Sequence, residues 1–379
     1  MTSTVITDVD VVGREGVDRG RTVLLRDDVI EYVGTAAAVQ VPPDASLVDG
    51  SGCSLLAGFI EGHAHPDGIP ALEAYPRAGV TTVVDMGSRD SSLHDAVRER
   101  ADLPTLIGPG IPATAPRGMQ TKTMGFPAEC EVADIGAAAR FVAARVAEGA
   151  HFIKVIVEDP KIPGTKALPP ELLAELVAQA HEAGRAAVAH AVTVNAFALA
   201  DDAGFDVITH VPVDGVPDDA RMDRMAARGV VLIPTLTMMD EAARELSSRL
   251  MLRVLSTLRI APSLRYSNAE RTVRELARRK TTILVGTDAN SEPKVPARPA
   301  FGTTYAEELE RLGASGMAPL EVLWGANGGL AEVFGLADRG IVAAGRRADL
   351  VLVEGDPTAD LGAARRIRTV WLGGRQVQR

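Results

Sequence analysis

Between residues 58 and 337 the chain alternates short apolar segments with helix-forming segments, and this alternation constrains the fold most. Strands that alternate with helices favour parallel βαβ units. Eight such units in about 280 residues match the usual size of a (β/α)8 TIM barrel, roughly 250 residues. An open, doubly wound sheet is the alternative. The expected strands are residues 55–60, 80–85, 103–108, 151–157, 186–190, 207–210, 230–235 and 282–286.

The two ends of the chain have a different pattern. Residues 1–57 and 338–379 contain short apolar or β-branched runs separated by glycines and aspartates, which is typical of strands and turns. Neither fragment is large enough to bury a core alone. We therefore expect an α/β protein in which a small β-sandwich domain, built from both termini, accompanies a barrel over residues 58–337.

Two helical segments are expected with particular roles. Residues 170–183 are rich in alanine, leucine and glutamate, begin at a proline pair and end before a glycine, which predicts a helix. The longest stretch between expected strands, residues 238–280, is expected to supply an extra helix or, over residues 238–268, a lid above the mouth of the barrel.

Composition excludes several classes of protein. The formal net charge is -10, and no basic stripe is visible, so a nucleic-acid partner is not expected. No run approaches the ~18 apolar residues of a membrane span, and the N-terminus lacks a signal peptide. The two cysteines are too few for a disulfide framework and favour a reduced, cytoplasmic location. A small-molecule substrate is the expected partner, and a homo-oligomer is left open.

Four of the seven histidines fall at the carboxyl ends of expected strands. His63 and His65 are two apart on one strand, so their side chains share a face. His190 and His210 end two later strands. In a barrel these ends meet in the mouth, where imidazoles suit a Zn²⁺ ion. For each histidine taken alone, a hydrogen-bonded structural role is the alternative.

Lys154 lies in the middle of an apolar strand, where an unpaired lysine is rarely buried. Its neutral amine can react with CO₂ to give a carbamate, and the two carbamate oxygens can bridge cations about 3.5–4 Å apart. A Schiff-base lysine and an ammonium paired with Asp85 or Glu158 are the alternatives. Asp288, after the last expected strand, is a candidate metal ligand, proton carrier or cap.

Longer motifs surround these residues. The run from Leu56 to His65 and the run from Gly340 to Val353 resemble the first-strand motif and the return into the β-domain of the amidohydrolase superfamily. The match covers nearly the whole chain and is closest to the imidazolonepropionase-like and Xaa-Pro dipeptidase-like branch. The family often has Pro-Gly and an aspartate where this chain has Ala57-Gly58 and Glu61. We expect altered packing there rather than loss of metal.

The resemblance implies two divalent metal ions, with zinc as the expected metal. In the family pattern two histidines hold the more buried ion, two hold the more exposed ion, a CO₂-derived lysine carbamate bridges both, and an aspartate binds the buried ion and shuttles protons. The corresponding residues here are, in that order, His63 and His65, His190 and His210, Lys154, and Asp288.

The implied enzyme is a binuclear metal-dependent amidohydrolase that cleaves a C–N bond of an amide, peptide or cyclic amide. A metal-bridging hydroxide is the nucleophile, and Asp288 is the catalytic proton shuttle. A cyclic amidine deaminase, an imidazolonepropionase-type ring opening and a non-catalytic scaffold are the alternatives. A substrate carboxylate, as in an N-acyl amino acid or Xaa-Pro dipeptide, has five candidate partners: Arg117, Lys122, Lys161, Lys294 and Arg298.

Overall fold

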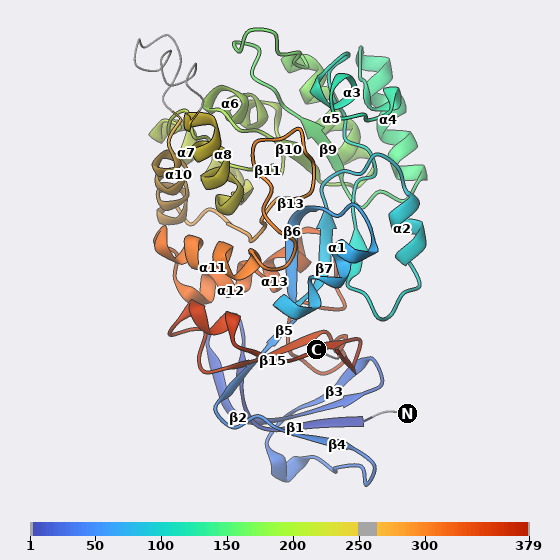
Figure 1. The fold of residues 1–379 in the computed structure, drawn as a ribbon, viewed down its shortest axis with the longest axis vertical. Coiled ribbons are helices and arrows are strands. Elements are labelled where there is room, and N and C mark those ends of the chain that lie inside the picture. Colours follow the sequence, from blue (N-terminus) through green and yellow to red (C-terminus); the bar gives the residue numbers. More distant parts are fainter. Residues whose placement is uncertain (1–2, 249–263, 378–379) are drawn as a thin grey trace.

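The computed structural model describes residues 3–248 and 264–377. Strands from both ends of the chain form one eight-stranded sheet in the order β16-β15-β14-β5-β1-β2-β3, with β4 paired to β1. In Figure 1 the red C-terminal strands lie beside the blue N-terminal strands, at one end of the molecule. The strands are β1 (Ser3–Val12), β2 (Val17–Arg26), β3 (Val29–Gly34), β4 (Ser46–Asp49), β5 (Cys53–Ala57), β14 (Leu350–Glu354), β15 (Ile367–Leu372) and β16 (Arg375–Gln376).

The pairing of β5 with β14 joins the two ends of the chain. These strands are antiparallel, from Leu350 opposite Ala57 to Glu354 opposite Cys53. Apolar side chains from both ends share one buried cluster, in which Leu55 and Trp371 are fully buried. Because each end supplies only part of this cluster, neither end can bury its apolar surface without the other.

The expected strand 55–60 is wrong in its bounds, because it spans the junction between two strands. β5 ends at Ala57 and β6 (Phe59–His65) begins two residues later. Both strands are buried, so the apolar run shows no break. Gly58 makes the crossing possible, since a Cβ there would lie 2.2 Å from the hydroxyl oxygen of Thr81.

Two four-stranded sheets, in which every strand pair is parallel, make up the rest. Their orders are β13-β6-β7-β8 and β12-β11-β10-β9. Single parallel bridges, Ala113 with Val155 and Leu232 with Ile283, connect edge strands of the second sheet to segments that follow β8 and precede β13 in the chain. The α/β class is confirmed. The remaining strands are β7 (Val80–Asp85), β8 (Thr105–Ile107), β9 (Ile153–Ile156), β10 (Ala187–His190), β11 (Val207–Thr209), β12 (Val231–Ile233) and β13 (Ala289–Asn290).

The expected strand at 282–286 is represented in the described chain by a bridge and hydrogen bonds rather than by an assigned strand. The backbone N–H of Leu284 donates to the carbonyl of Leu232 at 2.8 Å, and that of Gly62 donates to the carbonyl of Val285 at 3.1 Å. The segment therefore lies between β12 and β6. Its ladder is too irregular for a strand until β13.

Helices follow most of the parallel strands. The helix expected at 170–183 is confirmed as α5, which begins with a proline and ends at Glu182. The helices are α1 (Ile69–Glu73), α2 (Ser92–Val97), α3 (Met119–Lys122), α4 (Ile135–Ala147), α5 (Pro170–Glu182), α6 (Val194–Ala203), α7 (Asp219–Arg228), α8 (Leu236–Ser248), α10 (Tyr266–Arg278), α11 (Tyr305–Ala314), α12 (Pro319–Gly325) and α13 (Gly328–Val333).

The extra helical material expected between residues 238 and 280 is present as α8 and α10. The lid predicted for residues 238–268 includes residues 249–263, which lie outside the described residues. In the described part of the chain no helix is long and apolar enough to cross a membrane.

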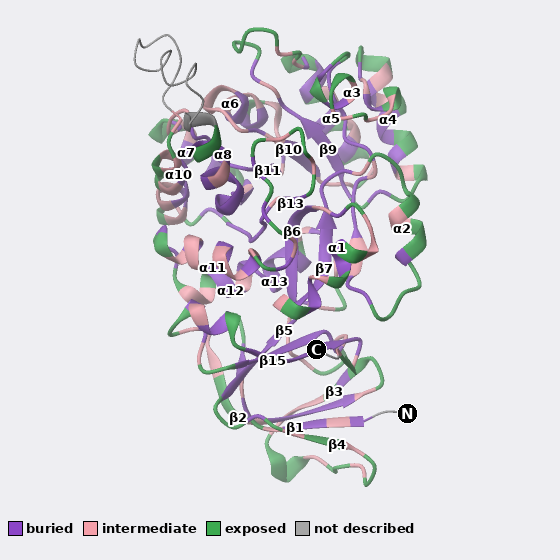
Figure 2. Cartoon of the chain, viewed as in Figure 1, coloured by how far each residue is buried: buried purple, intermediate pink, exposed green. Residues whose placement is uncertain are grey.

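Two buried clusters lie on the two sides of the parallel strands. One packs strand residues such as Val155 against helix residues such as Leu176. The other gathers Phe152, Ile60 and Ile233 with Phe334, which follows α13. Figure 2 shows the strands of this region as buried along their length. The second cluster also contains Val188, and by alternation Phe152 and Val188 lie on the same strand faces as Lys154 and His190.

Candidate metal centre

His63 and His65 on β6 converge with Asp288. The Nε2 atoms of the two histidines lie 3.4 Å and 3.3 Å from Oδ1 of Asp288. One ligand atom from each of these three residues lies within 4.8 Å of the others. The backbone N–H of Asp288 donates to the carbonyl of His63 at 2.7 Å, which fixes the aspartate beside the strand. Two imidazoles and one carboxylate at this spacing suit a divalent metal.

His190 and His210 extend this group from the neighbouring sheet. The ring centroids of His63 and His210 are 4.8 Å apart, and those of His210 and His190 are 4.5 Å apart. His190 ends β10, and His210 comes directly after β11. The four histidines expected at strand ends are therefore neighbours in space, in the order His65, His63, His210, His190.

Two of the histidines are oriented through their Nδ1 atoms. Nδ1 of His65 lies 3.1 Å from the carbonyl oxygen of Gly87. Because a carbonyl oxygen can only accept a hydrogen bond, Nδ1 is the donor. Nδ1 of His210 lies 2.8 Å from the hydroxyl oxygen of Thr235. Such partners fix the ring orientation of a metal-binding histidine, and the carbonyl partner also fixes the tautomer of His65. In both residues the Nε2 atom is left for a ligand.

The backbone is strained at three positions of this group. His210, Asp288 and Thr235 have φ angles of 71°, 58° and 49°, although none is a glycine. Conformations of this kind cost of order 1–3 kcal/mol each and cluster at functional sites. The strain is consistent with side chains that are aimed at a common point.

Lys154 on β9 is buried below the histidines. Its Nζ lies 2.8 Å from the hydroxyl oxygen of Thr209 and 3.7 Å from the sulfur of Met86. Burial lowers the pKa of Lys154 to about 7, against the attraction of Asp288. No ion pair to Lys154 occurs among the described residues; Asp85 instead accepts from His94 at 2.9 Å. The amine is therefore available in its neutral, nucleophilic form near neutral pH.

Burial also sets the charge of the imidazoles. It lowers the pKa of His63 and of His210 well below the usual value, and that of His190 to about 3, with Lys154 adding to the effect. Burial disfavours charge on His65 as well, but Asp288 outweighs it and the pKa of His65 is raised. Neutral imidazole is the form that binds metals.

A divalent metal fits these residues. The donor set is nitrogen and carboxylate oxygen, which zinc prefers, and the histidines that would hold it are neutral or paired with the aspartate. In the described chain the buried Nδ1 of His63 has no hydrogen-bond partner. Buried polar atoms are rarely left without one. The nitrogen of His63 nearest to Asp288 is Nε2, however, so the fit of the metal rests on the donor set.

The structure shows supporting residues that the sequence did not indicate. Asp85 accepts from the backbone N–H of Gly87 at 3.0 Å and so holds the loop whose carbonyl orients His65. Thr235 and Thr209 support His210 and Lys154. The two hydroxyls contact residues on or directly after other strands, so no local sequence pattern indicates them. Only Asp85 could have been suspected from the sequence, because it lies at the end of an expected strand.

Glu61, at a position where the family often has aspartate, also holds the ligand-bearing segments in place. Its carboxyl group accepts from the hydroxyl and backbone N–H of Thr287, at 2.7 Å and 2.9 Å, and from the backbone N–H of His63 at 3.1 Å. Burial raises the pKa of Glu61 to about 8. The glutamate therefore ties β6 to the turn that carries Asp288, and its longer side chain spans the two segments.

The five candidate partners of a substrate carboxylate are not drawn into this group. All five side chains belong to exposed residues. Lys294 donates from Nζ to the carbonyl of Thr123 and so ties two loops together. A substrate-binding role for the five residues stays a prediction: Arg117, Lys122, Lys161, Lys294 and Arg298.

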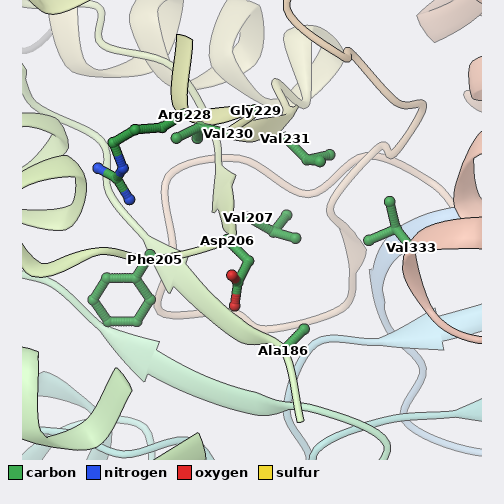
Figure 3. A pocket seen from close by; sticks show the side chains of 9 residues that line it. All are labelled: Ala186, Phe205, Asp206, Val207, Arg228, Gly229, Val230, Val231 and Val333. Atoms are coloured by element: carbon green, nitrogen blue, oxygen red, sulfur yellow. The ribbon is translucent and has the colours of Figure 1, made fainter. Parts of the chain in front are cut away.

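A cavity of about 250 Å³ lies at the opposite ends of the same strands (Figure 3). Its lining includes Ala186, Asp206 and Val230, which come directly before β10, β11 and β12. The carboxylate of Asp206 already accepts from His181 and from the backbone of Ala187. This cavity is therefore separate from the histidines, and the carboxylate that lines it is already hydrogen-bonded within the protein.

Comparison with known proteins places the chain in a family. The model of the amidohydrolase family matches residues 54–377. The chain belongs to the amidohydrolase family. The superfamily expected from the histidine, lysine and aspartate pattern is confirmed, and the protein is a hydrolase that acts on carbon–nitrogen bonds.

Solved structures of amidohydrolases share the fold over almost their whole length. A Xaa-Pro dipeptidase with bound methionine is 19% identical, with a TM-score of 0.83 and 99% of each chain covered. A prolidase in complex with N-methylphosphonate-L-proline is 22% identical, with a TM-score of 0.81 and 100% of each chain covered. Ochratoxinase of A. niger is 18% identical, with a TM-score of 0.79 and 99% and 95% covered. No curated protein matches the sequence significantly.

Proposed function

We propose that the amidohydrolase described here uses two divalent metal ions, with zinc as the expected metal, to hydrolyse an amide or peptide bond. The observation that carries the proposal is the convergence of three ligand atoms, from His63, His65 and Asp288, within 4.8 Å. The rings of His210 and His190 continue the group at 4.8 Å and 4.5 Å. The proposed ligands are His63, His65, Lys154, His190, His210 and Asp288.

The proposal includes the architecture that holds these ligands. The two parallel sheets form a single closed barrel over residues 58–337, and residues 1–57 with 338–379 form a composite β-sandwich domain. Support comes from the bridges Ala113–Val155 and Leu232–Ile283, which pair the edge strands β9 and β12 with segments that follow β8 and precede β13 in the chain. The cluster that includes Phe152 and Ile233 draws side chains from both sheets, as the interior of a barrel would.

Lys154 prepares the site by a reaction of its own. Its neutral amine attacks CO₂, a C–N bond forms, and the ammonium proton that results leaves to solvent, so that an anionic carbamate with two oxygens remains. Burial favours this step because it keeps a fraction of the amine unprotonated near pH 7. Thr209, 2.8 Å from Nζ, positions the side chain.

Metal ions bound here would lower the pKa of a water molecule and polarise the substrate carbonyl. Asp288 would take a proton from the attacking water and deliver it to the leaving nitrogen, the role of a general acid–base group. Its position suits both steps, since Oδ1 lies beside the Nε2 atoms of His63 and His65. The substrate class we propose is a dipeptide or N-acyl amino acid, and structural likeness to Xaa-Pro dipeptidases favours the dipeptide.

Metal analysis and a substrate panel test this proposal. Protein purified without chelators should carry close to two divalent ions. From a panel that also contains N-acyl amino acids, lactams and ring amidines, it should hydrolyse the Xaa-Pro dipeptides. His63→Ala should lose metal and activity. His181→Ala, on the exposed face of α5, is the matched control and should keep both. A clean value of one ion, with deamination of ring amidines, would contradict the proposal.

A further inference from the structure

Glu158 follows β9 at the end of the strand where the candidate ligands lie. The backbone N–H of Val157 donates to the carbonyl of His190 at 3.0 Å, so the parallel ladder continues past the last assigned residue of β9. Side chains on a strand alternate between its two faces. Glu158 is therefore on the same face as Lys154, four residues further along.

This face is the one that looks toward the candidate ligands. Val155 and Val157, on the other face, pack in the cluster that contains the helices, whereas Phe152 packs among the strands. His190 pairs with Ile156. Glu158 is thus one inward-facing position beyond the level of His190, about 7 Å along the strand. A glutamate there can reach a group bound next to the metal ligands.

The carboxylate of Glu158 has no partner within residues 3–248 and 264–377. Burial raises its pKa, and repulsion from Asp159 adds to the shift, while no hydrogen bond or cation opposes them. Asp159 itself is satisfied by Thr193 at 3.1 Å and by Asn195 at 2.8 Å. Lys161, in the same loop, is exposed. A partly buried carboxylate without a partner is costly, and a cationic ligand would remove that cost.

We infer that Glu158 binds the protonated amino group of the substrate and so selects peptides with a free N-terminus over N-acylated ones. The inference rests on the proposed function, because it assumes that the scissile carbonyl lies at the proposed ligands. In a dipeptide the amino group is attached one carbon away from that carbonyl. This is the region that Glu158 reaches from one position beyond His190.

The charge pattern of the other candidates agrees with this assignment. The basic residues considered for substrate binding are exposed, and Lys294 is tied to the carbonyl of Thr123. Glu158 is instead half-buried and has no partner among the described residues. Charge-assisted hydrogen bonds are the strong ones in protein recognition, so the loss of this carboxylate should be measurable in binding.

The test compares Ala-Pro with N-acetyl-Ala-Pro in the metal-loaded protein. The wild type should favour Ala-Pro by about tenfold or more in kcat/KM. Glu158→Gln should raise KM for Ala-Pro by a similar factor, leave kcat nearly unchanged, and leave N-acetyl-Ala-Pro unaffected. Glu158→Asp, which keeps the charge, should retain part of the preference. Glu171→Gln, at an exposed position at the start of α5, is the matched control.

Failure of the inference and failure of the proposed function give different results. If the wild type hydrolyses both compounds and Glu158→Gln keeps the same ratio, the inference is wrong and the function stands. If the wild type hydrolyses neither, the function is wrong, and calorimetric binding of the two intact compounds decides the inference. Tighter binding of Ala-Pro that Glu158→Gln abolishes would support it; equal or absent binding of both would overturn it.

Discussion

Lys154 Nζ lies 2.8 Å from the hydroxyl oxygen of Thr209, and this hydroxyl in turn donates to the carbonyl of Ala189 at 2.9 Å. A hydroxyl can satisfy a neutral amine, but it compensates little of the cost of burying an ammonium. The environment of Lys154 therefore favours the uncharged form, which is the reactant for carbamate formation.

The first prediction concerns this residue. Lys154→Ala should lose at least one of the two proposed metal ions and nearly all activity, because the proposed carbamate could not form. Acetate or propionate should partly restore both by occupying the vacated position. Lys154→Arg should not recover, since guanidinium stays cationic beside two cations. Metal content and turnover measure these effects.

The control for these variants is Lys280→Ala. The side chain of Lys280 is 81% exposed and should be dispensable. Two ions retained in Lys154→Ala, or substantial activity in Lys154→Arg, would contradict the carbamate and favour an ion-pairing lysine.

The second prediction concerns the hydroxyl that orients His210. Thr235→Val keeps the branched shape but removes the hydroxyl 2.8 Å from Nδ1. Metal affinity, measured by competition with a chromophoric chelator, should fall roughly 10–100-fold, the usual effect of losing such a partner. Thr281→Val is the control, since the buried hydroxyl of Thr281 has no partner in the described chain. Equal affinities in the two variants would show that Thr235 does not orient the ring.

The third prediction concerns pH and stability. Glu308 on α11 is fully buried and accepts from the backbone N–H groups of Leu236 and Thr237, both at 2.7 Å. Burial raises its pKa from 4.5 to about 7. The folded state then holds this proton more tightly than the unfolded state, so the carboxyl group destabilises the fold progressively as pH rises from 4.5 to 7. The loss is at most about 3 kcal/mol.

Glu308→Gln cannot titrate, so its free energy of unfolding should fall less between pH 5 and pH 7.5 than that of the wild type. Its stability should be lower at every pH, because an amide NH₂ faces backbone donors. Glu307→Gln, next to it on α11 and partly exposed, should keep the wild-type pH dependence. Urea unfolding at the two pH values measures the difference; parallel curves for wild type and Glu308→Gln would refute the assignment.

The fourth prediction concerns the shared sheet. Removing residues 350–379 takes away β14 to β16 and leaves the edge of β5 unpaired. The truncated protein should be insoluble, because β5 is buried along its whole length. Of the described residues, removing residues 375–379 deletes the short edge strand β16 and Val377, and it should leave soluble protein. Solubility and gel filtration distinguish the two, and a soluble, active long truncation would show that the ends do not cooperate.

The residues that spacing within a strand determines were predictable from the sequence. His63 and His65 share a face because they are two apart, and Lys154 stood out as a cation in an apolar run. The supports of these residues were not predictable, because they come from elements far away in the chain. Glu61 reaches Thr287 across 226 residues, and no local pattern encodes that contact.

Strand boundaries show the same limit. The apolar run through Gly58 predicts one strand, but the chain passes there from one sheet to another with no change in burial. At residues 282–286 the apolar composition predicts a regular strand, whereas the structure has an isolated bridge at Ile283 and backbone hydrogen bonds without an assigned strand. Composition predicts well which residues are buried, but it predicts strand register poorly, because register depends on the neighbouring strand.

The pairing of β5 with β14 also has a consequence for the order in which the molecule can form. During synthesis β5 leaves the ribosome early, yet its antiparallel neighbour is made only after the whole parallel region. Contacts of such high sequence separation form slowly, and their partners stay exposed meanwhile. The nascent chain should therefore depend on chaperones until its last strands emerge. This holds even if the region that carries the candidate ligands folds earlier.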